Sequence, residues 1–422
     1  MSQSASKTPN SRFATFLGNL FESKPDLVLG IIRNIRPNFA VPGKNGPVFI
    51  TRFQDVRESL ERPEIFNVVY GPMMDPSVGP FMLGRDNTTI NQRDKGIMRA
   101  LIQREDLPLI RSLVKQLTIE TLKPHIQSGR VDVVKVLSRV VPVRLTGEYF
   151  GFPGPDIDSM LRWSFATQHD MFHNNTRDQR VHQENIRAGT EMKAYLSKLI
   201  PERKHQLENE PSLEDILSRL LRLTTPQEIG FGIDRITTNI MGTLVGGVET
   251  TSQAIAQILQ QLFLRPEVLQ GAILAAQADD DELLFTYCWE ALRFDPINSV
   301  AFRHCVQDYK IASGSLRSLK IKAGKTVLIS ARSAMKDWRE VPSPREFRLD
   351  RPAYHYLHLG YGLHTCLGDQ ISRVQIPEII KQVLLLPNVK QLEPISRYGS
   401  PHLAEGQKSP FPESYEVGFD VG

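Results

Sequence analysis

The stretch Leu359-Gly-Tyr-Gly-Leu-His-Thr-Cys-Leu-Gly368 decides the fold of this chain. Two of its glycines precede the single cysteine and a third follows it, and glycine permits backbone conformations that other residues resist. A helix is predicted over residues 367–386, so Cys366 lies at a helix N-terminus. There the helix dipole and the free backbone N–H groups favour a thiolate over a thiol. A thiolate held in this way is a good soft ligand for iron.

The chain has two other cysteines, Cys288 and Cys305, and neither is framed by glycines. Both lie in or beside apolar stretches and are expected to be buried and inert, which is the commonest fate of a lone cysteine. An odd and low cysteine count argues against a disulfide framework and favours a reducing compartment. We therefore expect a cytoplasmic protein.

A second informative stretch, Met241-Gly-Thr-Leu-Val-Gly-Gly-Val-Glu-Thr-Thr251, falls inside a long apolar helix predicted over residues 226–264. Each glycine there costs roughly 1 kcal/mol relative to alanine. The Glu249 carboxylate is costly on an apolar surface unless it is paired or wet, and Thr250 can bond back to a carbonyl four residues earlier. These residues suggest a local opening of the helix for a flat ligand, dioxygen and water. A glycine pair for close helix packing, with Glu249 at the surface, is the equal alternative.

A third stretch places Glu290 and Arg293 three residues apart on one face of a helix predicted over residues 279–294. Such pairs are common on protein surfaces, where they contribute only about 0.2–0.5 kcal/mol. The neighbouring side chains here are apolar, which indicates a buried ion pair. A buried pair needs further partners to be tolerated.

Composition fits a folded protein: the hydrophobic share is 41% over 422 residues and the net charge is +4. We find no Lys/Arg block with interleaved aromatic residues, so nucleic-acid binding is not indicated. The N-terminus is polar and rich in serine, which predicts no membrane anchor. Residues 1–25 are expected to be flexible.

Helical periodicity dominates the middle of the chain, and strand-like runs are few and short. The predicted fold class is mainly α with a smaller β-rich portion. Besides the three helices above, helices are predicted over residues 91–105, 107–127, 131–150, 157–174, 183–209, 212–223 and 266–276, and strands over residues 48–53, 309–311, 319–321 and 326–330.

The three stretches resemble the motifs of the cytochrome P450 superfamily and occur in the family's order along the chain: residues 241–251, then 290–293, then 359–368. The cysteine loop matches the pattern Phe-x-x-Gly-x-His/Arg-x-Cys-x-Gly except at the first position, where Leu359 replaces Phe. The resemblance implies one domain over residues 1–422, with haem (heme b) between the long central helix and the helix that follows the cysteine loop. It also implies that Cys366 is the axial ligand of the haem iron.

The same resemblance implies roles for other residues around the cofactor. His364 and Arg303 would bind haem propionates, and Arg99 and Lys95 stand where the family often has a His-x-x-x-Arg pair for the other propionate. Lysine in place of histidine weakens that assignment, and a solvated side chain is the alternative for each basic residue. The remaining cofactor-binding candidates are Gly246, Leu359, Gly360 and Gly368.

For catalysis, the resemblance implies that Thr250 hydrogen-bonds the oxygen being activated and that Glu249 relays protons inward. Positioned acids and hydroxyl groups are suited to proton delivery. Glu290 and Arg293 would be structural and would meet a third residue from the irregular region before the cysteine loop, for which Arg351 is the candidate.

The expected activity is a monooxygenase reaction on a small hydrophobic substrate. O₂ is the second substrate, and a ferredoxin or flavodoxin with its NAD(P)H-dependent reductase supplies the electrons to a monomeric enzyme. Apolar, Met-rich walls suit a hydrophobic ligand and some plasticity. The candidates for substrate contact are Val69, Met73, Met74, Phe81, Met82, Phe172, Leu244, Val245 and Val300.

Three other interpretations compete with this one. A haem-thiolate enzyme that uses or rearranges peroxide, or a haem-binding sensor, would not need the acid-hydroxyl pair of Glu249 and Thr250. A helical protein without haem would require three coincidental motif matches.

Overall fold

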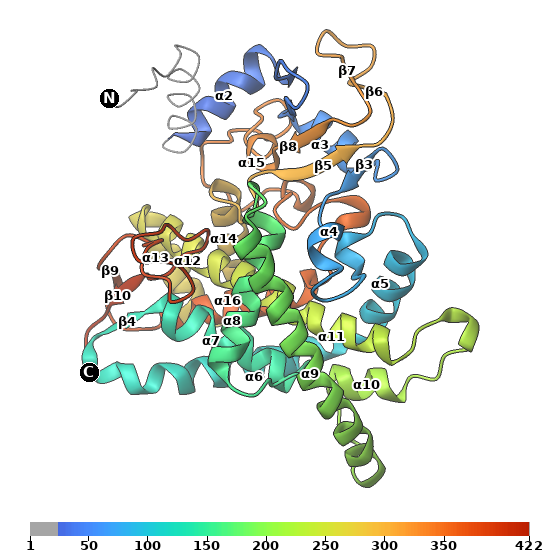
Figure 1. The fold of residues 1–422 in the computed structure, drawn as a ribbon. Coiled ribbons are helices and arrows are strands. Elements are labelled where there is room, and N and C mark those ends of the chain that lie inside the picture. The colour runs from blue at the N-terminus through green and yellow to red at the C-terminus, as the bar shows by residue number, and fades with distance from the viewer. Residues whose placement is uncertain (1–23, 422) are drawn as a thin grey trace, which may run out of the picture. The chain divides into compact units, whose positions relative to one another are not determined.

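Helices dominate the computed structural model, which describes residues 24–421, and the strands are short (Figure 1). The predicted fold class is confirmed. The described residues fall into two compact units, and the prediction of one domain stays a prediction. The first unit comprises residues 24–66, 298–346 and 352–358, and the second comprises the remaining described residues. No helix among residues 24–421 is long and apolar enough to cross a membrane.

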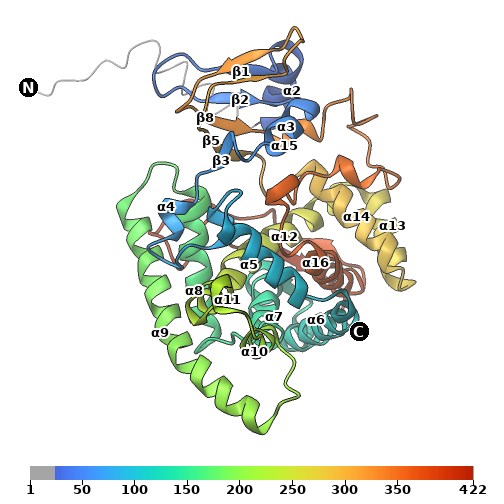
Figure 2. The same ribbon diagram turned by 90° about the vertical axis from the view of Figure 1, so that its right-hand side faces the viewer.

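The first unit is built on a five-stranded sheet of order β1-β2-β8-β5-β3 (Figure 2). β2 runs parallel to β8, and Ile50 is in register with Ile329. Both side chains are buried, as expected for strands covered on a face by helices. The elements are α2 (Pro25–Ile35), β1 (Asn38–Ala40), β2 (Val48–Ile50), α3 (Phe53–Leu60), β3 (Phe66–Val68, which crosses into the second unit), β5 (Ala301–Cys305), β6 (Tyr309–Ile311), β7 (Leu319–Ile321), β8 (Thr326–Ile329), α15 (Ala331–Ala334) and η7 (Ala353–His355).

The second unit is helical and carries the three motifs. Its centre is the helix α16, which packs against α6, α12 and α14. The main elements are α4 (Gly71–Met74), η1 (Met82–Gly84), α5 (Thr89–Leu101), α6 (Leu107–Leu122), β4 (Arg130–Asp132), η4 (Val133–Ser138), α7 (Val140–Glu148), α8 (Ile157–Gln168), η5 (His169–His173), α9 (Gln179–Asn209), α10 (Ile216–Arg222), α11 (Ile233–Gly247), α12 (Glu249–Phe263), α13 (Pro266–Gln277), α14 (Asp281–Phe294), η8 (Gly362–His364), α16 (Asp369–Leu384), β9 (Lys390–Gln391) and β10 (Glu416–Gly418).

The long central helix is interrupted, so the prediction of one continuous helix over residues 226–264 is wrong. It is divided into α11 and α12 at Val248, whose backbone angles are φ −99° and ψ −69°. The glycines and the back-bonding threonine weaken the helix at this point, which is the physical cause that the sequence indicated. The predicted opening of the helix is therefore confirmed, and only the prediction that the helix continues through it is wrong.

Other predicted elements also differ from the structure. Residues 131–150 hold the end of β4, the π-helix η4 and α7 rather than one helix. The last helix begins at Asp369, two residues later than predicted. The flexible stretch predicted for residues 1–25 lies almost entirely outside the described residues, and α2 begins at Pro25 because proline suits the first turn of a helix.

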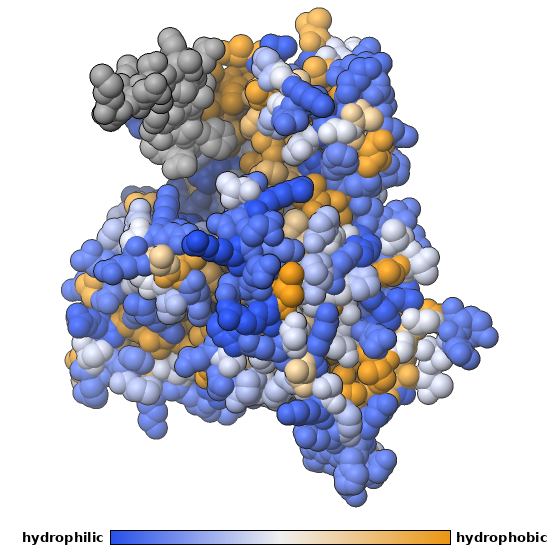
Figure 3. All heavy atoms as spheres, in the orientation of Figure 1, coloured by the Kyte–Doolittle hydropathy of each residue, from blue (hydrophilic) through white to orange (hydrophobic). Residues whose placement is uncertain are grey.

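The surface of the helical unit is mixed in character. On the face drawn in Figure 3, hydrophobic residues of this unit lie as separate spots among hydrophilic ones. Scattered apolar residues are normal on a protein surface.

Candidate active site

The cysteine loop is a tight backbone turn. The N–H of Cys366 donates to the carbonyl oxygen of Leu359 over 2.8 Å, which brings the two ends of the loop together. Gly360 has φ +81°, and a Cβ there would lie 2.7 Å from the carbonyl oxygen of His364. The turn therefore requires glycine at this position. Leu359 itself is half-buried.

Cys366 is half-buried on this loop. Burial raises its pKa, while the backbone N–H of Gly368 and the charges of Lys95 and Arg99 act in the opposite direction. The expectation that the helix start favours a thiolate stays a prediction. Cys366 precedes Gly368, the N-cap residue of α16, so it stands outside the helix. A bound metal ion would supply the missing stabilisation of the thiolate.

Lys95 of α5 reaches the same loop from the other side. Its Nζ donates to the carbonyl oxygens of Leu363, at 2.5 Å, and Thr365, at 2.8 Å. Burial lowers the pKa of Lys95 to about 8. Arg99, one helical turn further along α5, is exposed. Lys95 is therefore attached to the cysteine loop rather than solvated, and a propionate role for either residue stays a prediction.

His364 is held by Asp86, whose carboxylate lies 3.0 Å from its Nε2. Asp86 also accepts hydrogen bonds from the backbone N–H of Val68. The histidine of the loop is thus oriented by a carboxylate that the sequence motifs do not contain. A ring nitrogen fixed by a carboxylate is a common way to set the orientation of an imidazole.

The break between α11 and α12 presents open backbone. Gly246 is exposed and Gly247 is half-buried, and a Cβ added at either would meet no described atom within 4 Å. The hydroxyl of Thr250 donates to the carbonyl oxygen of Gly246 over 2.6 Å. The alternative use of these glycines, close helix packing, is therefore wrong. Close packing occurs instead at Gly242, where a Cβ would meet the ring of Phe81 at 2.3 Å.

Glu249 is buried rather than at the surface, with an exposed fraction of 1%. Its Oε2 accepts a hydrogen bond from Nε of Arg139 over 3.1 Å, and Nη2 of the same guanidinium lies 3.1 Å from that oxygen. Burial raises the pKa of Glu249 to about 7, although Arg139 acts to lower it. A carboxyl group with a pKa near neutrality can both hold and release a proton at physiological pH.

The Glu290 and Arg293 pair is fully buried on α14, with bonds of 2.7 Å and 2.9 Å between the two side chains. The structure brings Arg351 to the same carboxylate, with Nε 3.1 Å from Glu290 Oε1. The backbone N–H of Arg348 also donates to that oxygen, at 3.1 Å. These contacts provide the additional partners that a buried ion pair needs.

Two of the candidates lie in the first unit. Arg303 is a buried residue of β5 whose Nη1 donates to the carbonyl oxygen of Phe302 over 2.8 Å. Val300 precedes this strand and is half-buried. Their predicted roles at the cofactor and the substrate stay predictions.

The other substrate candidates belong to the second unit and divide into two groups. Five of them are buried by the chain itself, as core residues are. Three are half-buried, and Phe172 packs edge-on against Tyr70 with ring centroids 5.1 Å apart. The buried group is Met74, Phe81, Met82, Leu244 and Val245, and the half-buried group is Val69, Met73 and Phe172.

Sequence reasoning missed Asp86 and Arg139, which contact the motif residues His364 and Glu249, and Glu413, which contacts Arg139. Arg139 donates from Nη1 to Glu413 Oε2 over 2.8 Å. None of the three stands in a recognisable local pattern. The one available signal was the cost of burying Glu249, which calls for a cation but does not say where it lies in the sequence.

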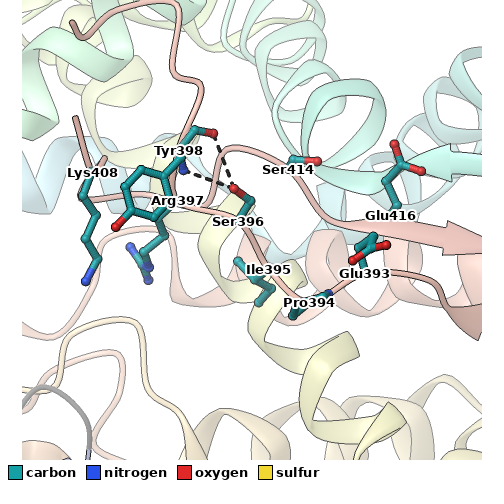
Figure 4. Close-up of a pocket in the computed structure, with 9 residues that line it drawn as sticks. All are labelled: Glu393, Pro394, Ile395, Ser396, Arg397, Tyr398, Lys408, Ser414 and Glu416. Carbon is teal, nitrogen blue, oxygen red and sulfur yellow. Dashed lines mark hydrogen bonds between the residues drawn. The ribbon is translucent and has the colours of Figure 1, made fainter. Parts of the chain in front are cut away.

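A pocket of about 600 Å³ lies in the C-terminal segment (Figure 4). Residues 393–398 form one wall, with Lys408, Ser414 and Glu416 completing the lining. Its lining includes no residue of the three motifs. Among residues 24–421 no group of three or more His, Cys, Asp and Glu side chains is arranged to hold a metal ion, so a single-cysteine axial site is the candidate metal site.

The geometry combines a turn that presents one cysteine, an interrupted helix with open glycines, and a buried acid next to a hydroxyl. Residues 156–393, more than half of the chain, match the family model of cytochrome P450. The chain belongs to the cytochrome P450 family. It is a monooxygenase of that family and uses heme b as its cofactor.

Several relatives match over most of their length. The mycinamicin IV hydroxylase/epoxidase of Micromonospora griseorubida is 27% identical over 385 residues, or 88% of each chain. The vitamin D(3) 25-hydroxylase of Pseudonocardia autotrophica is 25% identical over 340 residues, or 78% of each chain. The structure of CYP109E1 from Bacillus megaterium in complex with testosterone matches with a TM-score of 0.76 at 20% identity, covering 94% of this chain and 100% of that one.

The residues of the second unit fit such a cofactor. Cys366 is half-buried on its loop, and a Cβ added at Gly246 or Gly247 would meet no described atom within 4 Å. The helix α12 packs against α16, so the break and the cysteine loop belong to neighbouring helices (Figures 1 and 2). A flat macrocycle ligated by Cys366 would find open backbone at the helix break.

Proposed function

We propose that this enzyme hydroxylates or otherwise oxidises a small hydrophobic organic substrate, with electrons from a separate ferredoxin or flavodoxin and its NAD(P)H-dependent reductase. The observation that carries the proposal is the acid-hydroxyl pair at the break, where buried Glu249 and Thr250 are consecutive and Thr250 bonds to Gly246. A peroxide-using enzyme or a sensor would have no need of a proton-delivering pair at this place.

The chain's own residues would act as follows. Heme b bound through Cys366 supplies the oxidising chemistry. Glu249, with its pKa of about 7, holds a proton beside the break. The Thr250 hydroxyl donates to Gly246 in the resting chain and can rotate to donate into the open space. These groups would move protons from the interior to the open side of α12.

The remaining assignments belong to the same proposal. His364, Lys95, Arg99 and Arg303 would face the cofactor's carboxylates, because cations and imidazole are suited to carboxylate binding. Glu290, Arg293 and Arg351 would hold the region before the cysteine loop, since their bonds link α14 to residues 348–351.

For the substrate, the half-buried Val69, Met73 and Phe172 offer apolar surface that can adapt. The named relatives act on mycinamicin IV and vitamin D(3), and one solved structure contains testosterone. These names support a hydrophobic organic substrate for this chain also.

For the redox partner and setting, the net charge of +4 suits an acidic electron carrier. The three cysteines are free, as expected for a monomer in the reducing cytoplasm. Among the basic residues that precede the cysteine loop, Lys336 is paired with Asp26 and Arg348 with Asp350. Their charges are partly neutralised, so they contribute little to docking.

The test is the coupling of reductant consumption to product in the Thr250→Ala variant. We expect unchanged haem binding but diversion of reducing equivalents to hydrogen peroxide, because the hydroxyl that directs protons is gone. Thr250→Ser, which keeps the hydroxyl, is the matched control and should remain coupled. Unchanged coupling in Thr250→Ala, or turnover that needs peroxide and no reductant, would refute the proposed function.

A further inference from the structure

Arg139 stands between two buried carboxylates. Its guanidinium bonds to Glu249 on one side and to Glu413 on the other, at 3.1 Å and 2.8 Å. A third hydrogen bond runs from Nη2 to the carbonyl oxygen of Pro412 over 3.0 Å. The exposed fractions of Arg139, Glu249 and Glu413 are 6%, 1% and 1%. The three side chains thus form one cluster shielded from bulk water.

The charges of this cluster do not balance. Two ionised carboxylates against one guanidinium would leave a net charge of −1 in the interior. A buried unpaired charge costs several kcal/mol, and a carboxyl group avoids that cost by taking up a proton. Two carboxylates that share a site cannot readily both ionise. Neutralisation by one proton is therefore the favoured state.

Other titratable groups around the cluster do not supply the missing positive charge. Arg397 keeps its positive charge near Glu413, but it also faces Asp295, so its charge is shared with a carboxylate outside the cluster. His402 is half-buried near Arg139 and Glu413, and burial, with the charge of Arg139 adding to it, lowers its pKa. An imidazole whose pKa lies below its usual value is neutral at pH 7. The shared proton therefore remains with the carboxylates.

We propose that Glu413 and Arg139 are positioning residues for Glu249. The two carboxylates share one guanidinium and hold one proton between them. Glu249 delivers this proton to the open side of α12. This inference rests on the proposed function. When Glu249 releases the proton, both carboxylates are ionised and Arg139 stabilises them. A proton taken up from water then restores the starting state, so no net charge is gained.

The C-terminal segment fixes Glu413 and brings it near solvent. Ser409 donates its hydroxyl to Glu413 Oε1 over 2.5 Å, and the backbone N–H of Glu413 donates to the carbonyl oxygen of Ser396 over 2.8 Å. Ser396, the acceptor of this bond, and Ser414, the residue after Glu413, line the pocket of Figure 4, together with Arg397. Water in that pocket is the source from which the proton would be replaced.

The pKa of Glu249 agrees with this arrangement. Burial raises it to about 7, Arg139 opposes the rise, and Glu413 adds to it. If Glu413 were neutral, its contribution would vanish and Glu249 would form a simple one-to-one pair with Arg139. The proton would then be held less firmly at neutral pH.

The test is an infrared pH titration of the purified holoenzyme, which follows the band of protonated carboxyl groups. We expect the wild type to show a buried carboxyl that loses its proton near pH 7. Glu413→Gln and Glu249→Gln, which keep the size of the side chain, should each lose this band. Glu405→Gln is the matched control, since it is an exposed residue of the same segment outside the cluster and the pocket lining and should retain the band.

A second readout is the pH profile of coupled turnover. In Glu413→Gln the alkaline limb should move to lower pH, whereas Glu413→Asp, which keeps the charge, should restore the wild-type limb. Retention of an unchanged titrating band in Glu413→Gln would overturn the proposal. The infrared readout needs no turnover, so its result is independent of the Thr250 test. Either test can fail while the other succeeds, and a failure of this inference can therefore be distinguished from a failure of the proposed function.

Discussion

The ammonium group of Lys95 lies 2.5 Å from the carbonyl oxygen of Leu363. Its second bond, to Thr365 at 2.8 Å, means that a lysine from α5 holds the backbone on both sides of His364. Hydrogen bonds from a charged donor, such as these two, are stronger than hydrogen bonds between neutral groups. The cysteine loop is therefore shaped by a residue far from it in the sequence, and the loop's order depends on that residue.

Lys95→Met should loosen the loop. Loss of a hydrogen bond from a charged group to a part-buried acceptor costs about 1.5–3 kcal/mol. We expect a loss of that size in the free energy of unfolding and faster release of haem, measured by denaturant titration and by transfer of haem to apomyoglobin. Gln92→Met, an exposed position on the same helix, should leave the free energy of unfolding unchanged. Equal stability of both variants would contradict the anchoring role.

Cys366→Ala should abolish thiolate ligation, because the thiolate supplies the axial bond in a cytochrome P450. The measurement is the absorption spectrum of the dithionite-reduced protein under carbon monoxide, in which thiolate-bound iron gives a strongly red-shifted Soret band. The control is Cys305→Ser, a position whose thiol bonds to the carbonyl oxygen of Gln307 in the first unit. If the alanine variant kept the red-shifted band, Cys366 would not be the ligand.

Glu290→Gln should destabilise the second unit strongly. Arg293 has no exposed surface, and removal of one partner from a buried ion pair costs about 3–5 kcal/mol. Urea unfolding followed by circular dichroism measures this loss. Glu282→Gln, an exposed change on the same helix, should alter the free energy of unfolding by less than about 0.5 kcal/mol. A small effect of Glu290→Gln would show that the buried network contributes little.

The raised pKa of Glu249 predicts a pH dependence of stability. Since the folded pKa, about 7, lies above the ordinary value of 4.5, the folded chain binds the proton more tightly than the unfolded chain. This contribution is fully present below pH 4.5 and is lost as the pH rises through 7. Its size is roughly 3 kcal/mol. Denaturant titrations between pH 5 and pH 8.5 measure the free energy of unfolding. In Glu249→Gln the part of its decline with pH that comes from Glu249 should vanish. If the decline is unaltered, other groups cause it.

Local patterns in the sequence determined the class of the fold and the motif residues. Helical periodicity, the glycine-framed cysteine and the weak helix around Gly246 are each encoded by residues that are neighbours in the sequence. Gly360 shows the reason: its φ of +81° follows from the turn that its neighbours form. The sequence therefore determined the cysteine loop, the opened helix and the family that they resemble.

Only the tertiary structure decided which distant side chains serve those motifs. Arg139 bonds to Glu249 and also to Glu413, which lies 274 residues away from it in the sequence, and Asp86 orients His364 across 278 residues. No local period places such partners, because a buried charge requires compensation in space and accepts it from any element that packs nearby. The same holds for Cys366: its burial depends on the whole fold and raises the pKa of the thiol, although the adjacent N–H of Gly368 acts to lower it.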